Sequence, residues 1–457
     1  MRWLGTIPAN WGVLRSKRLF APRTELARSD DIQLSATQAY GVIPQADFEQ
    51  AVGRKVTRVL QHLEKRRHVE VDDFVISMRS FQGGLERAWA SGCIRSSYVV
   101  LHPTTSLIVG YYAYLFKSHG YIRALQSTAG FIRDGQDLTF DNFCAVDLPF
   151  PPLAEQAAIV RFLDHTDRRV RRYISAKRKL IRLLEEQKQA IIRRAVTRGL
   201  DPNVRLQPSG IEWLGDVPEH WIVAALRHRY AQVLGKMLDT KRITGEHSLP
   251  YLRNTDVQWD QINTKDLPVM DIPLHKHGRY TVRAGDLLVC EGGEVGRAAI
   301  WTGQLSACGF QKALHRLRPR RADLDMPRFL CFAFRAAANA GAFSDGHVST
   351  IAHLTGDKLR GHAFPFPPAA EQASIVRWLD TALARIATAV ECTRRETLLL
   401  REYLTRLIAD VVTGKLDVRE AAARLPAETE DSEPIDEIEA EPEAGDAGDD
   451  EGAPEEA

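Results

Sequence analysis

A long internal repeat constrains this chain more than any other feature of its sequence. Residues Leu148–Asp164 return as Phe364–Asp380, and 13 of the 17 paired positions are identical at a constant offset of 216 residues. A shorter repeat precedes each copy, because Trp3–Trp11 resembles Trp213–Trp221. A long-period repeat fixes the architecture before any local pattern does. Two copies are too few for a solenoid, so the sequence predicts a pseudo-two-fold object built from one chain.

Each long repeat opens a segment with the pattern of an α-helix. Pro151-Pro152 marks the start of the first segment, and no proline or glycine follows until Gly199, which predicts a helix over residues 154–198. A helix of this length spans roughly 65 Å. Apolar residues recur every three or four positions along both segments and form heptad seams. The seam residues expected to pair the helices are Leu163, Val170, Leu184, Ile191, Leu379, Ile386, Leu400 and Leu407.

The two seams predict an antiparallel coiled coil. Each helix needs a partner for one narrow apolar stripe, and the other helix has the same length and register. The alternative is that each helix packs on its own domain as a long surface helix. Strand-like and helix-like patterns mix outside the helices, which indicates an α+β fold. We therefore expect a globular domain, a helix, a second globular domain, a second helix and a disordered acidic tail, over residues 1–150, 151–200, 201–366, 367–418 and 419–457.

Local patterns in the first domain place its elements coarsely. Residues 48–62 and 111–126 have helical spacing, while 74–78 and 94–101 have the composition of strands. The segment between those strands, residues 79–87, reads as a glycine-rich basic loop. In the second domain a strand at 287–290 is followed by a similar loop at 291–298. The domains therefore share a strand–loop–strand plan although their detailed sequences differ.

The charge is divided unevenly along the chain. Residues 427–457 hold 15 Asp and Glu and no Lys or Arg, and without them the overall charge of +2 becomes +17 on residues 1–426. A basic body with an acidic tail is typical of nucleic-acid-binding proteins, although a general bias toward arginine is the alternative. The six cysteines are scattered, and no secretory signal or run of 18 apolar residues is present. We therefore expect a reducing, cytoplasmic location.

Catalytic signatures are absent from the sequence. There is no G-x-x-x-x-G-K-[ST] phosphate loop, and Gly292-Gly293-Glu294-Val295-Gly296 does not have the spacing of a dinucleotide-binding turn. No Asn-Pro-Pro-aromatic stretch, which would hold a flipped base for amino methylation, is found. His275 and His277 lack the partner residues of a metal site. We therefore predict no catalytic residues and no metal ligands in this chain.

Basic, glycine-rich loops with interleaved amides are the remaining candidates for function. Arg and Gln side chains can read guanine and adenine edges in the major groove, and further Arg and Lys bind phosphates. The alternative for each residue is a solvated surface charge. The candidate DNA-binding residues are Arg79, Gln82, Arg87, Arg95, Arg253, Arg297, Gln311, Lys312 and Arg316.

The duplicated motif resembles the conserved regions of type I restriction–modification DNA specificity subunits. The resemblance rests on Pro151-Pro152-Leu153-Ala154-Glu155-Gln156 with Ile159-Val160 and Leu163-Asp164, on the copy at 367–380, and on Ile211–Trp221 as the opening of a target-recognition domain. It covers residues 1–420. Met1-Arg2 replaces the lead-in found at 209–212, and the acidic tail has no counterpart in the family pattern.

The resemblance implies a non-catalytic subunit that determines which DNA sequence a larger complex recognises. Each target-recognition domain would read one half of a bipartite site in double-stranded DNA, and the paired helices would act as a ruler for the spacer. Two adenine-methylating modification subunits and the restriction subunits would bind this scaffold. S-adenosylmethionine, ATP and Mg²⁺ are expected on those partners, with no cofactor on this chain.

Three other hypotheses stay open at this point. A coiled-coil adaptor that bridges proteins would show no sequence preference on DNA. A regulatory protein that binds a palindromic operator would more naturally be a homodimer with identical halves. An enzyme with unrecognised chemistry would transfer methyl groups to DNA from S-adenosylmethionine unaided.

Overall fold

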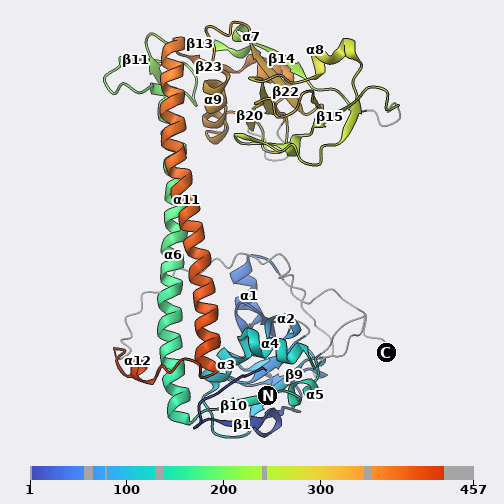
Figure 1. Ribbon diagram of the computed structural model, residues 1–457, viewed down its shortest axis with the longest axis vertical. Helices are drawn as coiled ribbons and strands as arrows, with labels where there is room; N and C mark the ends of the chain where they lie inside the picture. The colour runs from blue at the N-terminus through green and yellow to red at the C-terminus, as the bar shows by residue number, and fades with distance from the viewer. Residues whose placement is uncertain are drawn as a thin grey trace. The chain divides into compact units, whose positions relative to one another are not determined.

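The computed structural model describes residues 3–55, 65–77, 80–128, 138–238, 244–343 and 353–426. It contains two compact units, each made of one globular domain and one half of each long helix. The first unit comprises residues 1–178 and 394–457, and the second comprises residues 179–393. The division cuts both helices in their middle. Figure 1 shows the domain elements of each unit beside the two helices.

A four-stranded sheet in the order β2-β9-β6-β7 forms the centre of the first domain. Successive residues of β6 point to opposite faces, so Phe74 and Ile76 enter an aromatic core with α3 while Val75 enters a second core. The elements of this domain are β1 (Gly12–Arg15), η1 (Ser16–Arg18), β2 (Phe20–Pro22), β3 (Leu34–Thr37), β4 (Gly41–Pro44), α1 (Gln45–Val52), β5 (Arg67–Val69), β6 (Phe74–Ile76), α2 (Ser80–Gly83), β7 (Glu86–Arg87), β8 (Gly92–Ile94), β9 (Val99–Pro103), α3 (Val109–Lys117), α4 (His119–Gln126), α5 (Phe140–Cys144) and β10 (Asp147–Phe150).

The second domain repeats this topology with a different sequence. Its four-stranded sheet has the order β14-β22-β19-β20, and β19 again alternates between two cores. The elements are β11 (Leu206–Pro208), β12 (Asp216–Pro218), β13 (Ile222–Ala225), α7 (Leu226–Arg229), β14 (Tyr230–Leu234), β15 (Ser248–Leu252), η4 (Asn254–Asp256), β16 (Val257–Gln258), β17 (Gln261–Ile262), β18 (Val269–Asp271), η5 (Leu274–Lys276), α8 (His277–Tyr280), β19 (Leu287–Cys290), β20 (Ala298–Ile300), β21 (Gly309–Phe310), β22 (Leu314–Pro319), α9 (Pro327–Asn339), α10 (Gly356–Gly361) and β23 (Ala363–Phe366).

The two long helices are α6 (Leu153–Arg198) and α11 (Ala369–Val412), and α12 (Arg419–Ala423) follows them. In the first unit, Leu163 near the start of α6 shares a core with Leu407 near the end of α11. In the second unit, Ile192 near the end of α6 shares a core with Leu379 near the start of α11. The helices therefore run antiparallel in each unit, which confirms the predicted coiled coil and α+β fold.

Several local predictions in the first domain need correction. The segment predicted as one strand over 94–101 forms β8 and β9, separated by a turn. The predicted loop 79–87 contains the short helix α2 and the strand β7. The helical pattern at 111–126 is divided by Ser118, which caps α4 with its side chain. The predicted helix 48–62 corresponds to α1 up to Val52, and residues 56–62 lie outside the described residues. The tail is predicted to be disordered from residue 419, but Arg419–Ala423 form the helix α12. Residues 427–457 of this tail lie outside the described residues.

Candidate nucleic-acid interface

A buried glutamine fixes each domain to its helix in the same way. In the first unit, Gln156 accepts a hydrogen bond from the backbone N–H of Ile108 at 2.9 Å and donates to the carbonyl of Pro151 at 2.8 Å. Ile108 is the residue that precedes α3, so the glutamine holds the amino end of that helix. In the second unit, Gln372 accepts from the N–H of Met326 before α9 at 2.9 Å and donates to Pro367. Both side chains are almost completely buried.

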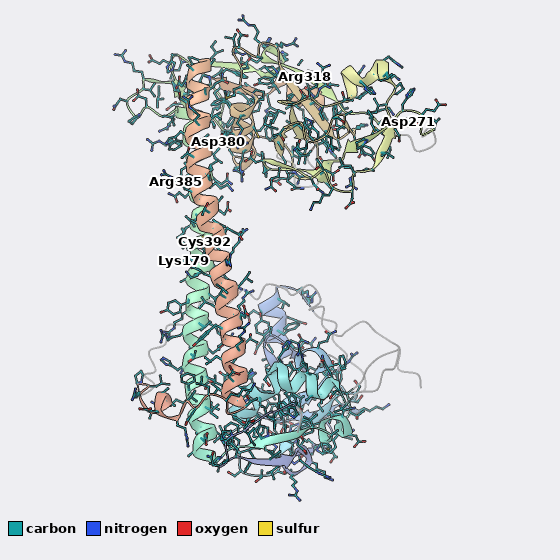
Figure 2. The ribbon with its side chains drawn as sticks, viewed as in Figure 1. Lys179, Asp271, Arg318, Asp380, Arg385 and Cys392 are labelled. Carbon is teal, nitrogen blue, oxygen red and sulfur yellow. The ribbon has the colours of Figure 1, made fainter. Side chains whose placement is uncertain are left out.

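An aspartate two turns further along each long helix makes a second contact with the same domain helix. Asp164 accepts a hydrogen bond from the Tyr114 hydroxyl of α3 at 2.7 Å. Asp380, labelled on α11 in Figure 2, accepts from Arg328 of α9 at 2.9 Å. The duplicated Gln and Asp therefore form an anchor, which we define as Gln156 with Asp164 or Gln372 with Asp380. It holds α3 in one unit and α9 in the other.

The glutamate that precedes each glutamine contacts polar side chains of the shorter repeat. Glu371 accepts hydrogen bonds from Trp221 Nε1 at 3.1 Å and lies 2.8 Å from His220 Nε2. Glu155 accepts from Asn10, the counterpart of His220, at 3.0 Å. Gly414 has a φ of +74°, and a Cβ there would lie 2.4 Å from the Pro8 ring, so the turn after α11 requires glycine.

Removing the amide at this anchor is expected to destabilise the second unit. In Gln372→Leu, the N–H of Met326 and the carbonyls of Pro367 and Leu324 lose their buried partner. Because each unpaired buried polar group costs about 1–3 kcal/mol, we expect a loss of about 3 kcal/mol in the free energy of unfolding. Denaturant titration measures this. Gln258→Leu is the matched control, since the exposed Gln258 bonds one carbonyl and should change stability by less than about 0.5 kcal/mol. Equal losses in both variants would contradict the anchor.

The candidate residues of the first domain lie in unlike environments. Gln82 is exposed on α2, and Arg95 is half-buried after β8. Arg87 donates two hydrogen bonds to Asp72 at 2.6 and 2.8 Å, and its guanidinium lies 4.3 Å from the ring centre of Trp89. Arg79 lies outside the described residues. Gln82 and the Arg87–Trp89 pair therefore present functional groups at the surface.

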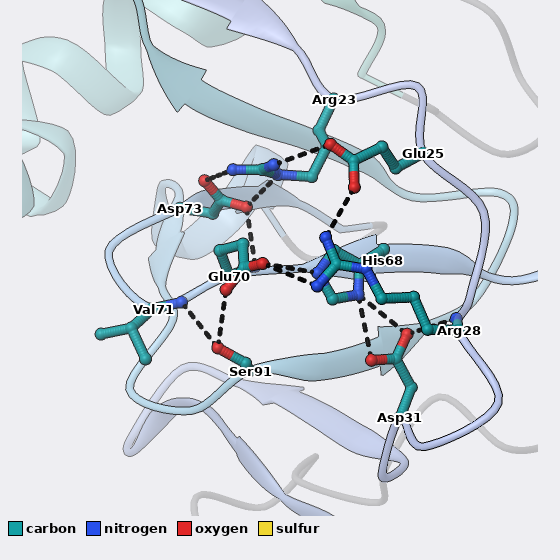
Figure 3. A network of polar contacts seen from close by, with 9 residues as sticks. All are labelled: Arg23, Glu25, Arg28, Asp31, His68, Glu70, Val71, Asp73 and Ser91. Carbon is teal, nitrogen blue, oxygen red and sulfur yellow. Dashed lines mark hydrogen bonds and ion pairs between the residues drawn. The ribbon is translucent and has the colours of Figure 1, made fainter.

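A network of ion pairs joins the segment 23–31 to β5 and to the turn that follows β5 (Figure 3). Figure 3 shows Asp31, Glu70 and Arg28 gathered around His68. His68 is 1% exposed, with Nδ1 at 2.8 Å from Asp31 and Nε2 at 2.9 Å from Glu70. Burial lowers the pKa of His68, but hydrogen bonds to Glu70 and Asp31 outweigh it and raise the pKa overall. The hydrogen bond with His68 in turn lowers the pKa of Glu70 to about 2. The histidine is therefore held as an imidazolium between two carboxylates.

The stability of the first unit should fall in alkaline solution. Folding raises the pKa of His68, so its protonated form stabilises the folded state. This stabilisation is fully present below the pKa of the unfolded state and is lost as pH rises through the pKa of the folded state. Thermal unfolding should therefore show a lower midpoint for the first unit at pH 9 than at pH 6. His68→Gln should lower the midpoint at pH 6 and weaken this dependence, whereas the exposed His119→Gln should preserve both. An unchanged dependence in His68→Gln would contradict the assignment.

The candidate residues of the second domain divide into occupied and exposed side chains. Arg253 is bound through two nitrogens to the buried Asp256, and Arg297 donates to the carbonyl of Asn254 at 2.9 Å. Arg316 is 4% exposed and donates to the carbonyl of Thr281 at 2.6 Å, and burial lowers its pKa to about 10. Gln311 is half-buried, while Lys312 is exposed in the turn between β21 and β22. These three arginines are therefore engaged within the domain, and Lys312 is the exposed cation among the candidates of this domain.

Two loops of this domain are joined at their tips. Asn254 of the 253–256 segment donates from Nδ2 to the carbonyl of Gly292 at 2.9 Å. Arg297 returns the contact from the other end of the 291–297 loop. Trp259 lies beside them, where it donates to Glu294 and packs under Arg335. The glycine-rich loop is therefore fixed in place by the neighbouring segment.

Sequence reasoning did not single out Trp89, Trp259 or the anchor residues as site residues. The identity between repeats was the available signal for Gln156, Gln372, Asp164 and Asp380, because these positions persist while the domains diverge. Trp89 is 56% exposed, and a bare tryptophan beside an arginine can stack on a base. No sequence pattern distinguishes such a tryptophan from a core residue.

The predicted helix-pairing residues are buried or half-buried. Leu163, Val170, Leu379, Ile386 and Leu407 are buried, and Leu184, Ile191 and Leu400 are half-buried. Lys177 interrupts the seam of α6 and forms an ion pair with Glu396 of α11 at 2.5 Å. The ion pair keeps a charged residue compatible with the helix contact.

The described residues contain neither a membrane-spanning helix nor a metal-binding cluster. None of the helices in these ranges is sufficiently long and apolar to cross a membrane. Within the same ranges, no group of three or more His, Cys, Asp or Glu side chains is placed to hold a metal ion.

Comparison with known proteins gives related sequences. Residues 233–398 match the family described as the type I restriction modification DNA specificity domain. The specificity subunit of the type I restriction enzyme EcoKI from Escherichia coli K12 is 22% identical over 336 residues. The match covers 69% of this chain and 68% of that protein.

Solved structures share the fold. A chain from a study of complex assembly and conformational transition in a type I R-M system has a TM-score of 0.67 and 16% identity, covering 90% of this chain and 100% of that one. The HsdS subunit of Thermoanaerobacter tengcongensis has a TM-score of 0.53 and 18% identity, covering 91% and 98%. The structures show the shared fold, and the family match together with the repeated motif and the E. coli relative places the chain in the family of type I restriction–modification DNA specificity subunits.

Proposed function

We propose that this chain reads a bipartite site in double-stranded DNA, with one half-site for each globular domain. The observation that carries the proposal is the pair of matching anchors. Gln156 and Gln372 hold two domains of one topology in one manner, although the candidate loops of those domains differ in sequence. Two domains that are attached to the helices in the same way but carry different loops suit a DNA site whose two halves differ in sequence.

We further propose that the paired helices set the spacer and hold the partner subunits. In this proposal the chain is not an enzyme, and two modification subunits and the restriction subunits carry the chemistry in the cytoplasm. One structurally similar chain comes from a study of complex assembly in a type I R-M system, which supports this assignment. S-adenosylmethionine, ATP and Mg²⁺ would bind to those partners.

Mapping methylated adenines in the host genome tests the proposed function. A strain with the gene intact should methylate one bipartite sequence, and a strain lacking the gene should lose methylation at that sequence alone. Complementation with the wild-type chain should restore it. An unchanged methylation pattern in the deletion strain would exclude the proposal and favour a protein-bridging adaptor.

Lys312 is the exposed cation for which we expect the clearest phosphate contact. Lys312→Ala should weaken binding to duplex DNA to a similar degree for target and unrelated sequences, because a phosphate contact carries no base information. The slope of log K against log salt should fall by about 1. Lys265→Ala removes another exposed lysine of the same domain and should leave the slope unchanged. A Lys312→Ala variant with the wild-type slope would show that this lysine does not touch the backbone.

A further inference from the structure

The two long helices have similar lengths but very different net charges. Helix α6 carries 13 Lys and Arg against 5 Asp and Glu, whereas α11 carries 6 of each. Pairing of the helices rests on the apolar seam, and Lys177 adds an ion pair with Glu396 of α11, but an excess of eight positive charges is more than this pairing requires. Such an excess is costly through self-repulsion unless anions approach it. The basic helix therefore needs an explanation outside the fold.

Part of this charge forms an exposed surface in the first unit. Arg161, Arg169 and Arg172 are exposed on α6, and we call them the arginine face. Arg161 and Arg172 are three helical turns apart and lie on nearly one line along the helix, separated by roughly 16 Å. Arg169 lies beside the exposed ring of Tyr173. Within the described part of the chain, no carboxylate forms an ion pair with Arg169 or Arg172.

The described chain ends on this face. After α11, Val418 and Ala422 are buried and hold the 418–423 segment against the first unit. Arg161 then donates hydrogen bonds to the carbonyl of Leu425 at 2.8 Å and to that of Pro426 at 3.2 Å. Leu425 and Pro426, the last described residues before the segment 427–457, therefore lie at Arg161 of the arginine face.

The composition of the remaining segment complements that face. Its 31 residues contain 15 Asp and Glu and no Lys or Arg. An extended chain of this length reaches roughly 100 Å, far beyond the arginine face. A segment tethered at its contact surface has an effective concentration in the millimolar range, which favours even weak pairing. No folded structure is needed for such pairing.

We propose that residues 427–457 bind the arginine face of α6 as an internal polyanion and shield it from other polyanions. Non-specific duplex DNA would have to displace the segment before it reached the face. Target binding by the domains would be unaffected, because the candidate loops lie on other elements. The segment would thus lower non-specific binding while leaving the recognised sequence unchanged. The proposal does not depend on the proposed function.

Arginine modification locates the contact in the full chain. A tail-neutral variant replaces the 15 Asp and Glu of residues 427–457 by Asn and Gln. Phenylglyoxal modification followed by peptide mass spectrometry should show Arg169 and Arg172 reacting about threefold or more slowly in the wild type than in this variant at 0.05 M salt. Arg395 and Arg401, which are exposed on α11, should react equally in both proteins. Protection should vanish in 1 M salt, where the Debye length is about 3 Å.

Binding to random-sequence duplex tests the shielding. The tail-neutral variant should bind this duplex about threefold or more tightly than the wild type at low salt. The gain should disappear when Arg169→Gln and Arg172→Gln are added, and it should persist with Arg395→Gln and Arg401→Gln.

Three results would overturn the proposal. The arginines of α6 could react equally in wild type and tail-neutral variant, or the arginines of α6 and α11 could be protected alike. Alternatively, Arg169 and Arg172 could be unprotected in both proteins until duplex is added, which would assign the face to DNA. Loss of sequence-specific methylation would count against the proposed function and leave these comparisons intact.

Discussion

Exchanging residues 16–146 for the corresponding domain of another specificity subunit is expected to replace one half of the recognised DNA sequence and leave the other half unchanged. The second domain, its anchor and its loops are untouched by the exchange. A change of one half-site would reduce methylation at the original sequence to background, since each altered base pair costs about 1–3 kcal/mol and several change at once. Adenine mapping in the host measures the result.

The junctions of this exchange follow from the structure. The sequence alone suggests an exchange of residues 1–145, but β1 pairs with β10 and Trp11 packs beside Gly414. Keeping residues 1–15 and 147 onward preserves both contacts. Within the exchanged segment, Gln156 binds the backbone N–H of residue 108, which a replacement domain also supplies. An exchange of residues 226–362, which keeps the paired strands β13 and β23, is the reciprocal control and should change the other half-site. If either exchange altered both half-sites, the modular assignment would be wrong.

Lengthening both helices by one heptad is expected to lengthen the recognised spacer by about three base pairs. Seven residues add about 10.5 Å of helix, and one base pair rises 3.4 Å. Inserting the heptads after Arg178 in α6 and after Thr393 in α11 preserves the apolar period in both helices. Both half-sites should stay the same. Methylation at the original spacer should fall to background, because the two domains would no longer meet their half-sites together.

A matched insertion separates spacing from a general disturbance. Seven residues inserted after Gly245 lengthen a surface loop of the second domain, where a Cβ would meet open space. This variant should keep the original spacer. A double-heptad protein that still recognises the original spacer would show that the helices do not set it.

The scaffold was predictable because its determinants are local and repeated. Pro151-Pro152 and Gly199 bound a helix that the structure places at Leu153–Arg198, within one residue of the expectation. Two equal seams required partners, and antiparallel pairing was the simplest solution. The duplication also predicted that the domains share a plan, as their sheets in the orders β2-β9-β6-β7 and β14-β22-β19-β20 show.

The environment of each candidate side chain was not predictable. The sequence of a glycine-rich segment does not show whether its arginine faces DNA or binds a carboxylate within the domain. Arg87 lies against Asp72, and Arg316 is enclosed and bound to the carbonyl of Thr281, 35 residues away in sequence. Strand pairing brings these partners together, and the sequence pattern around each arginine does not predict which distant residue it will contact.

The sequence by itself determined the two long helices, their seams, the matching topology of the domains and the separation of acidic from basic charge. Only the tertiary structure decided that Gln156 and Gln372 hold α3 and α9 through backbone atoms, and that the chain leaves α12 beside Arg161. The reason is physical. Periodicity and breakers act over a few residues and are written in consecutive letters, whereas a buried hydrogen bond depends on which distant atoms the packed core brings within about 3 Å.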